Sequence, residues 1–179
     1  MRIISGIHRG RRIIAPNNLP VRPTTDRAKE ALFNILNNEF YFQNLSVLDL
    51  FAGTGNIGYE FVSRGVQHVV CVDKNAKCIC FIEQTSETLK APIQVVQNEI
   101  SSFLSKHNGS YDIVFADPPY DLEFDKFKHF IDQIFSNKMI RSEGVLIVEH
   151  SKHTDLSSLN GFSNSRSYGS CIFSFFRSH

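Results

Sequence analysis

An acidic residue, two prolines and an aromatic ring follow one another at the end of an apolar run, in the stretch YDIVFADPPYD. Consecutive prolines stop a strand and fix the backbone, so the carbonyl groups around Pro118 can be presented to a ligand. The Asp117 carboxylate and such a carbonyl can accept two hydrogen bonds from one exocyclic NH₂ group, while the Tyr120 ring stacks on the base that carries it. An ordinary strand-to-loop turn is the alternative, because Asp-Pro and Pro-Pro are common turn dipeptides. The stretch predicts a catalytic site formed by Asp117, Pro118, Pro119 and Tyr120.

A glycine loop lies upstream, in LDLFAGTGNIG, where Gly53, Gly55 and Gly58 have the G-x-G-x-x-G spacing between a predicted strand and a predicted helix. Glycines let the backbone turn tightly and approach a ligand closely. Asp73 ends the next predicted strand, 20 residues after Gly53, where a carboxylate can accept both hydroxyls of a ribose. Together they indicate an adenosine ligand, although a purely structural turn and a nicotinamide dinucleotide site also fit the pattern.

Asp49 precedes this loop, four residues before Gly53. The corresponding position of a dinucleotide-binding loop is usually aliphatic, because a carboxylate would face the negative pyrophosphate. An acid here suits a ligand with an amino group or another positive charge, such as the methionine part of S-adenosylmethionine. A solvated acid at the end of a strand is the alternative interpretation.

The elements that must position these residues form an alternating pattern of short apolar runs and helix-length segments. Near-continuous apolar strands separated by helices are typical of a parallel sheet covered on both faces, whose ligands bind beyond the carboxyl ends of the strands. The tail is different, because two strands flank Gly169 without a helix between them, which predicts an antiparallel last strand. We predict strands at 46–51, 68–73, 93–97, 112–117 and 145–150, and helices at 56–64, 75–90, 99–107, 123–136 and 153–159.

The N-terminal part combines a predicted hairpin with a predicted helix. Residues 2–15 hold two short β-prone stretches around SGIHRG, with arginines at and beside the turn. Apolar residues recur at helical spacing over 26–40, with Thr24 or Thr25 as the N-cap and Asp26 in the first turn. We expect one domain over 1–179, made of a basic hairpin extension (1–25) and a catalytic core (26–179).

Charge is distributed unevenly along the chain. Seven Lys and Arg residues against two acids give the first 30 residues a net charge of +5, whereas the remaining residues carry −4. Such a basic end suggests a nucleic acid partner or, alternatively, a solvated basic surface. The sequence shows no apolar run of membrane-spanning length, no signal peptide pattern and no zinc-ligand spacing, so we expect a cytoplasmic protein without a metal.

DLFAGTG followed downstream by DPPY resembles the class I S-adenosylmethionine-dependent methyltransferases that act on an exocyclic amine of a nucleobase. MRIISGIHRGRRI, VRPTTDRAKEALFNIL and the closing SRSYGS resemble the RsmD family, which methylates the exocyclic N2 of one guanine in bacterial small-subunit rRNA. The resemblance covers nearly the whole chain. Arg166, Ser170 and Cys171 depart from the family's ending, so we assign them no role.

The resemblance implies a Rossmann-like, seven-stranded, mostly parallel sheet and a monomer that binds S-adenosylmethionine and small-subunit 16S rRNA. In the family pattern an acid after the third strand contacts the adenine amine; it is usually aspartate, and Glu99 stands there. The implied cofactor-binding residues are Asp49, Phe51, Ala52, Gly53, Thr54, Gly55, Asp73, Lys74, Glu99, Ile100, Thr24 and Thr25. The arginines expected to contact RNA phosphates are Arg9, Arg11, Arg12, Arg22 and Arg27.

Three other functions stay open at this point. An adenine-N6 DNA or RNA methyltransferase of the same fold would use the same amine acceptors. A nicotinamide-dependent oxidoreductase is supported by the glycine loop and Asp73 but argued against by Asp49 and DPPY. The third is a non-catalytic RNA-binding or ribosome-assembly protein with a methyltransferase fold, against which the intact DPPY motif argues.

Overall fold

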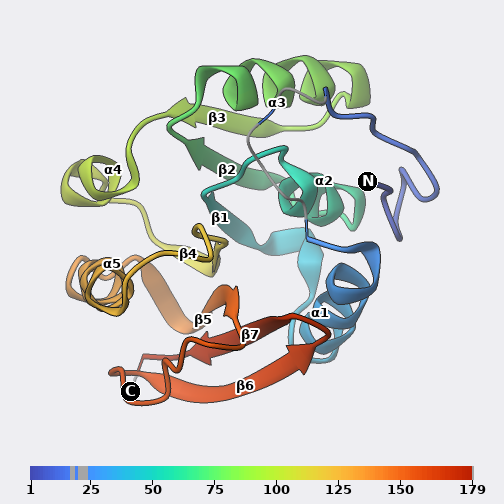
Figure 1. Ribbon diagram of the computed structural model, residues 1–179. Coiled ribbons are helices and arrows are strands. Elements are labelled where there is room, and N and C mark those ends of the chain that lie inside the picture. The colour runs from blue at the N-terminus through green and yellow to red at the C-terminus, as the bar shows by residue number, and fades with distance from the viewer. Residues whose placement is uncertain (17–18, 20–23, 179) are drawn as a thin grey trace.

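The computed structural model describes residues 1–16, 19 and 24–178. Within them, seven strands form one sheet in the order β3-β2-β1-β4-β5-β7-β6 (Figure 1). Strands β1 to β5 run parallel, and β7 is antiparallel to both of its neighbours, which confirms the predicted antiparallel last strand. The strands are β1 (Ser46–Leu50), β2 (His68–Asp73), β3 (Ile93–Gln97), β4 (Tyr111–Ala116), β5 (Ile140–Ser151), β6 (Phe162–Tyr168) and β7 (Cys171–Phe176).

Helices cover both faces of this sheet, and each face has its own apolar core (Figure 1). Val47 of β1 belongs to the core under α1 (Asp26–Glu39), α2 (Asn56–Ser63) and α3 (Ala76–Leu89). Its neighbour Leu48 belongs to the core under α4 (Ile100–Lys106) and α5 (Phe124–Ser136). Successive side chains of a strand point to opposite faces, so a strand buried on both faces is apolar throughout. A short 3-10 turn, η1 (Phe42–Asn44), leads from α1 into β1.

Helix α1 begins as its sequence predicts. Thr25 is the N-cap, and its Oγ1 accepts a hydrogen bond from the Ala28 N–H at 3.2 Å. Asp26 lies in the first turn, where a negative charge complements the helix dipole. Leu32 and Phe33 are fully buried against the sheet and α2. The following loop and strand therefore start from a fixed helix.

The two N-terminal stretches predicted to form a hairpin lie antiparallel, with a β-bridge between Arg2 and Arg12. Hydrogen bonds flank the bridge on both sides: the Ile3 N–H donates to the Arg11 carbonyl at 2.9 Å, and the Ile13 N–H donates to the Met1 carbonyl at 3.0 Å. The segment is also fixed to α2, since the Glu60 carboxylate accepts from the N–H groups of residues 4 and 5 at 2.8 and 3.1 Å. Because these two N–H groups donate to Glu60, they cannot donate to a partner strand, and the hairpin stays short.

The predicted short helix at 153–159 is wrong, because this segment consists of turns and irregular backbone. The Asp155 carboxylate accepts a hydrogen bond from the Ser157 N–H at 2.9 Å, a local bond that competes with helix formation. Leu156 and Leu159 are buried, so their helical spacing reflects two anchored turns. Within the described residues, no helix is both long enough and apolar enough to cross a membrane.

Candidate active site

A cavity of about 440 Å³ opens beyond the carboxyl ends of β1, β2 and β4. This edge of an open parallel sheet is where ligands of such folds bind. Of the residues predicted to bind the cofactor or to act in catalysis, Gly55 and Thr25 do not line the cavity and all the others do. Four lining residues were missed by the sequence analysis, namely Asn56, Ile57, Asn75 and Phe115.

Asp73 is held at the cavity wall by two backbone donors. The Gly53 N–H donates to its Oδ2 at 2.9 Å and the Asn75 N–H to its Oδ1 at 2.8 Å. Each carboxylate oxygen keeps a second lone pair for a ligand donor. Asn75 is the N-cap of α3, so the same short segment ends β2, fixes Asp73 and starts the helix. An Asp followed two residues later by Asn was a sequence signal for this arrangement.

The glycine loop has an unusual backbone conformation. Phe51, Gly53 and Gly55 all have positive φ values, of 58°, 55° and 76°. Glycine adopts this region freely, whereas a residue with a Cβ is strained in it. Strain of this kind concentrates at ligand-binding sites, and the Phe51 side chain lines the cavity. The loop therefore makes a tight turn at the wall of the cavity.

Asp49 lies at the end of β1 and is almost completely buried, with 2% of its surface exposed. The Cys71 thiol donates to its Oδ2 at 3.8 Å, and the Gly58 N–H also donates to it. Burial raises the pKa of Asp49 to about 7, an effect that the Gly58 hydrogen bond partly offsets. A buried acid of this kind is stabilised in its charged form by a cationic ligand group. The solvated strand-end acid considered from the sequence does not fit this burial.

Asp117 and the two prolines form the opposite wall. The Asp117 N–H donates to the Leu50 carbonyl at 3.3 Å, which ties the residue after β4 to β1. The Pro119 carbonyl accepts from the Leu122 N–H at 2.9 Å, whereas no described residue donates to the Pro118 carbonyl. Burial, followed by the negative charges of Glu149 and Asp49, raises the pKa of Asp117 well above its usual range.

Tyr120 borders the same cavity with 38% of its surface exposed. Its Oη donates to the Glu149 Oε1 at 3.0 Å, and the Thr24 Oγ1 donates to the Glu149 Oε2 at 2.7 Å. Glu149 lies in β5, has 3% of its surface exposed and was not singled out by the sequence analysis. An acid within the apolar run VLIVEH was the available signal.

Glu99 lines the cavity but also caps α4. Its Oε2 accepts from the N–H groups of Ser101 and Ser102 at 2.8 and 3.2 Å, as well as from the Ser101 hydroxyl. The Ser101 hydroxyl bond is the main cause of a lowered pKa at Glu99. Because Oε2 is occupied by these bonds, the Oε1 of Glu99 is the oxygen that could accept from an adenine amine. This contact stays a prediction.

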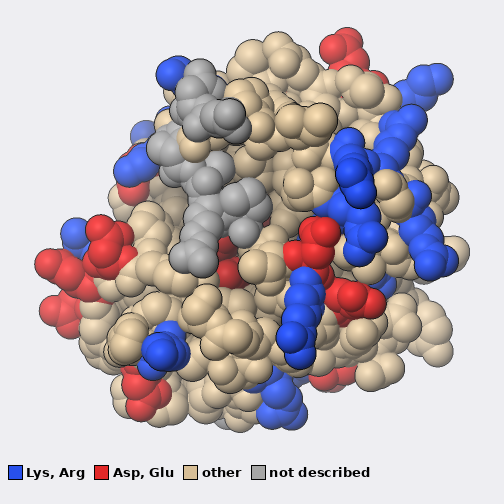
Figure 2. All heavy atoms as spheres, turned by 45° about the vertical axis from the view of Figure 1, so that its right-hand side comes forward, with Lys and Arg blue, Asp and Glu red and all other residues tan. Residues whose placement is uncertain are grey.

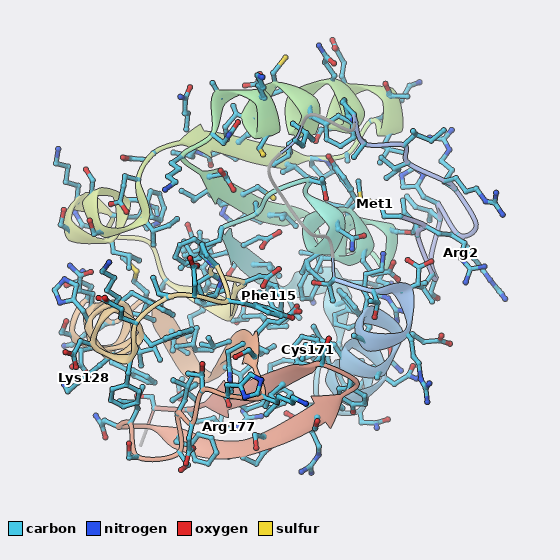
Figure 3. The ribbon with its side chains drawn as sticks, viewed as in Figure 1. Met1, Arg2, Phe115, Lys128, Cys171 and Arg177 are labelled. Atoms are coloured by element: carbon cyan, nitrogen blue, oxygen red, sulfur yellow. The ribbon has the colours of Figure 1, made fainter. Side chains whose placement is uncertain are left out.

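The predicted RNA-binding arginines lie outside the cavity. Arg9, Arg11 and Arg12 are exposed on the N-terminal segment and Arg27 is exposed on α1, whereas Arg22 lies outside the described residues. Figure 2 shows Lys and Arg side chains gathered on the right-hand part of the face on which the N-terminal segment lies. Met1 contacts the glycine loop through its sulfur, 3.4 Å from the Thr54 hydroxyl, while Arg2 points outward (Figure 3).

Among the described residues, no cluster of His, Cys, Asp and Glu side chains could hold a metal.

Comparison with known proteins identifies a family model and several relatives that match most of this chain. The family model described as Conserved hypothetical protein 95 matches residues 1–177. Ribosomal RNA small subunit methyltransferase D of Escherichia coli is 33% identical over 150 residues, which cover 83% of this chain and 74% of that protein. The solved structure of the Escherichia coli protein yhhF has a TM-score of 0.86 at 29% identity, and the match covers 98% of this chain and 96% of that chain.

A more distant solved structure shares the fold. The Thermus thermophilus 16S rRNA N2 G1207 methyltransferase RsmC, in complex with AdoMet and guanosine, has a TM-score of 0.71 at 18% identity; the match covers 87% of this chain and 44% of that chain. The cavity of this chain is lined by the buried acid Asp49, by Gly53 of the glycine loop and by the strand-end acid Asp73. With its matched residues and its site, the chain belongs to the RsmD family of S-adenosylmethionine-dependent methyltransferases.

Proposed function

We propose that this protein transfers a methyl group from S-adenosylmethionine to the exocyclic N2 of a guanine in small-subunit 16S rRNA. The observation that carries the proposal is the convergence of Asp117 and Pro118 on the cavity that Asp49 and Asp73 also line. Two acceptors suited to an amine thus face the space suited to the cofactor. The names of the relatives, which are rRNA methyltransferases, support RNA as the substrate.

The cofactor side of the site is assigned to the residues around β1 and β2. Asp73, fixed by two backbone N–H groups, is suited to accept both ribose hydroxyls. Asp49 faces the methionine end, whose ammonium group stabilises its charged form. When bound, the cofactor supplies a methyl group activated by its attachment to a sulfonium.

The acceptor side has to orient a weak nucleophile, because the lone pair of a guanine amine is delocalised into the ring. Hydrogen bonds from the NH₂ group to Asp117 and to the Pro118 carbonyl turn that lone pair toward the methyl carbon. Alignment of this kind contributes ~7 kcal/mol or more to lowering a barrier. Asp117 also stabilises the positive charge that develops on nitrogen, and the methylated amine then loses its proton readily without a dedicated base.

The substrate base must leave its stack to reach this site. Tyr120 offers a half-exposed ring at the cavity edge, on which an unstacked guanine can lie. Arg9, Arg11 and Arg12, together with Arg27, are exposed and can contact the phosphates around the target nucleotide. Such contacts position the RNA without reading its sequence.

The test uses methyl-labelled S-adenosylmethionine and small ribosomal subunits from a strain that lacks the gene, followed by digestion of the rRNA to nucleosides. We expect labelled N2-methylguanosine with the wild type and none with Asp117→Ala. The exposed neighbouring acid provides the matched control, Asp121→Ala, which should retain activity. Labelled N6-methyladenosine would keep the amine chemistry and overturn the substrate. No label, with S-adenosylhomocysteine binding demonstrated, would reject small-subunit rRNA as the substrate.

A further inference from the structure

Glu149 joins two segments that line the cavity without lining it itself. Its carboxylate belongs to β5 and lies behind the cavity wall. The Oε2 accepts from the hydroxyl of Thr24, 125 positions away in sequence, and the Oε1 accepts from the hydroxyl of Tyr120, 29 positions away. Thr24 immediately precedes the N-cap of α1, and Tyr120 follows the two prolines. One buried side chain therefore sets the spacing between the start of α1 and the acceptor loop.

Thr24 is itself a fixed point. Its carbonyl accepts from the Asn56 Nδ2 at 3.2 Å, and the Asn56 Oδ1 accepts from the Lys29 ammonium at 2.7 Å. With Thr24 anchored in this way, its hydroxyl restrains the Glu149 carboxylate through a hydrogen bond of 2.7 Å. The remaining oxygen then has a defined position, and so has the Tyr120 hydroxyl that donates to it.

We propose that Glu149 is a positioning residue, which fixes the plane of the Tyr120 ring so that a stacked nucleobase presents its amine to Asp117. This inference rests on the proposed function. A tyrosine side chain has two rotatable torsions, and a hydrogen bond at its far end restrains both of them. Hydrogen bonds to an ionised acceptor are roughly twice as strong as those between neutral groups, which suits a carboxylate to this task.

The same carboxylate acts on Asp117 through its charge. The titratable groups that face Asp117 are Asp49 from β1, Glu149 from β5, Cys171 from β7 and Tyr120 from its own loop. The negative charge of Glu149 is the second cause, after burial, of the raised pKa of Asp117. Removing it makes the ionised form of Asp117 less unfavourable. The pKa of Asp117 then falls, and the acid limb of the pH–rate profile moves to lower pH.

These two effects can be separated by substitution. Glu149→Gln removes the charge and weakens the hydrogen bond to Tyr120, whereas Tyr120→Phe removes only the hydrogen bond and keeps the ring. The double variant completes a cycle with the wild type. Glu123→Gln, a change of the same kind at an exposed position before α5, is the matched control. Methylation of small ribosomal subunits and binding of S-adenosylhomocysteine are measured for each protein.

We expect each single variant to lose about tenfold in kcat, because Tyr120→Phe removes the hydrogen bond to the charged carboxylate and Glu149→Gln replaces it with a weaker bond to a neutral amide. The double variant should be little worse than the poorer single variant, since both changes break the same link. S-adenosylhomocysteine affinity should stay within about threefold of the wild type in Tyr120→Phe, because that change leaves the cofactor side intact. Only variants with Glu149→Gln should show the acid limb at lower pH.

Independent, multiplying losses in the double variant would overturn the inference, as would an unshifted acid limb in Glu149→Gln. The inference would also be overturned if Tyr120→Phe lost activity and S-adenosylhomocysteine affinity by the same factor, because the hydrogen bond would then only maintain the structure of the site. These results refute the role of Glu149 while the wild type remains active. A wild type that transfers no methyl group to rRNA refutes the proposed function itself, and the inference with it.

Discussion

The Lys29 ammonium group and the Glu60 carboxylate lie 3.6 Å apart, and neither side chain is exposed to solvent. Lys29 also donates to the Arg2 carbonyl and to the Asn56 Oδ1, both at 2.7 Å. Glu60 accepts in addition from Arg64 at 2.8 Å. Burial lowers the pKa of Lys29, and the charge of Glu60 partly offsets this effect. The pair connects the N-terminal segment, α1 and α2 at one buried point.

Removal of the ammonium should therefore be costly. Lys29→Met leaves the charge of Glu60 buried with less compensation, and we expect the free energy of unfolding to fall by about 3–5 kcal/mol. The exposed pair Lys128–Asp132 provides a matched control, since Lys128→Met should cost at most about 1 kcal/mol. Urea denaturation measures both values. Equal, small losses would show that the burial of the Lys29 pair has no energetic consequence.

Asp49 should make stability depend on pH. Its pKa is about 7 in the folded protein against an ordinary value of 3.8, so between these values the folded state holds the proton more tightly than the unfolded state. Stability therefore falls as pH rises from about 4 to 7, by up to about 1.4 kcal/mol per pH unit from this group. Asp49→Asn removes that contribution. Urea curves of both proteins across this range should diverge steadily, and parallel curves would contradict the prediction.

The Tyr120 ring should contribute stacking energy to substrate recognition. Tyr120→Ala removes the ring, and we expect kcat/KM for small subunits to fall about 10- to 100-fold, since stacking of a base on an aromatic ring contributes about 1–3 kcal/mol. Tyr41→Ala, at a tyrosine with 93% of its surface exposed, should have no effect. Full activity of the Tyr120→Ala variant would exclude stacking as a major contribution.

The N-terminal arginines should give binding of RNA a steep salt dependence. Each lost phosphate contact lowers the slope of log K against log salt by about 0.7–0.9, so a variant with Arg9, Arg11 and Arg12 changed to Gln should bind more weakly and with a shallower slope. Lys128→Gln is the control, because Lys128 lies on α5, on the opposite side of the molecule from Arg2 (Figure 3). An unchanged slope in the triple variant would remove these arginines from the interface.

Gly58 should not tolerate a side chain, for reasons of packing. A Cβ at this position would lie 2.7 Å from the Cys71 sulfur, so Gly58→Ala should cost about 1–3 kcal/mol by overpacking. Cys71→Ala removes the obstructing sulfur. In the Cys71→Ala background the cost of Gly58→Ala should shrink to below about half, as measured by thermal or urea denaturation. An undiminished cost would place its cause in the helix backbone.

The sheet and the cavity lining were predictable because their determinants are local. The apolar runs at β1, β2 and β4 specify buried strands, and the acids and glycines that follow them specify what lies at the strand ends. The short helix at 153–159 was predicted wrongly because the spacing of Leu156 and Leu159 suits a helix and an anchored turn equally. The Asp155 side chain decides between the two by bonding to the local backbone.

The buried polar network was not predictable in this way. Lys29 lies in an amphipathic helix, where a lysine ordinarily faces solvent, and its burial depends on residues some 30 positions away. Glu149 has the same character, since its partners belong to two distant segments. Sequence patterns report on periodicity and composition, whereas these contacts arise from how the elements pack.

The hydrogen bond between Thr24 and Glu149 joins residues 125 positions apart in sequence. Strand β1 pairs with β4, although β2 and β3 lie between them in the sequence. Contacts so distant in sequence form late in folding, because closing a long loop is entropically unfavourable. During synthesis, a nascent chain that has not yet emerged beyond β5 holds the glycine loop but lacks the residue that joins Thr24 to Tyr120. The wall that joins Thr24, Tyr120 and Glu149 therefore forms only after β5 has been synthesised.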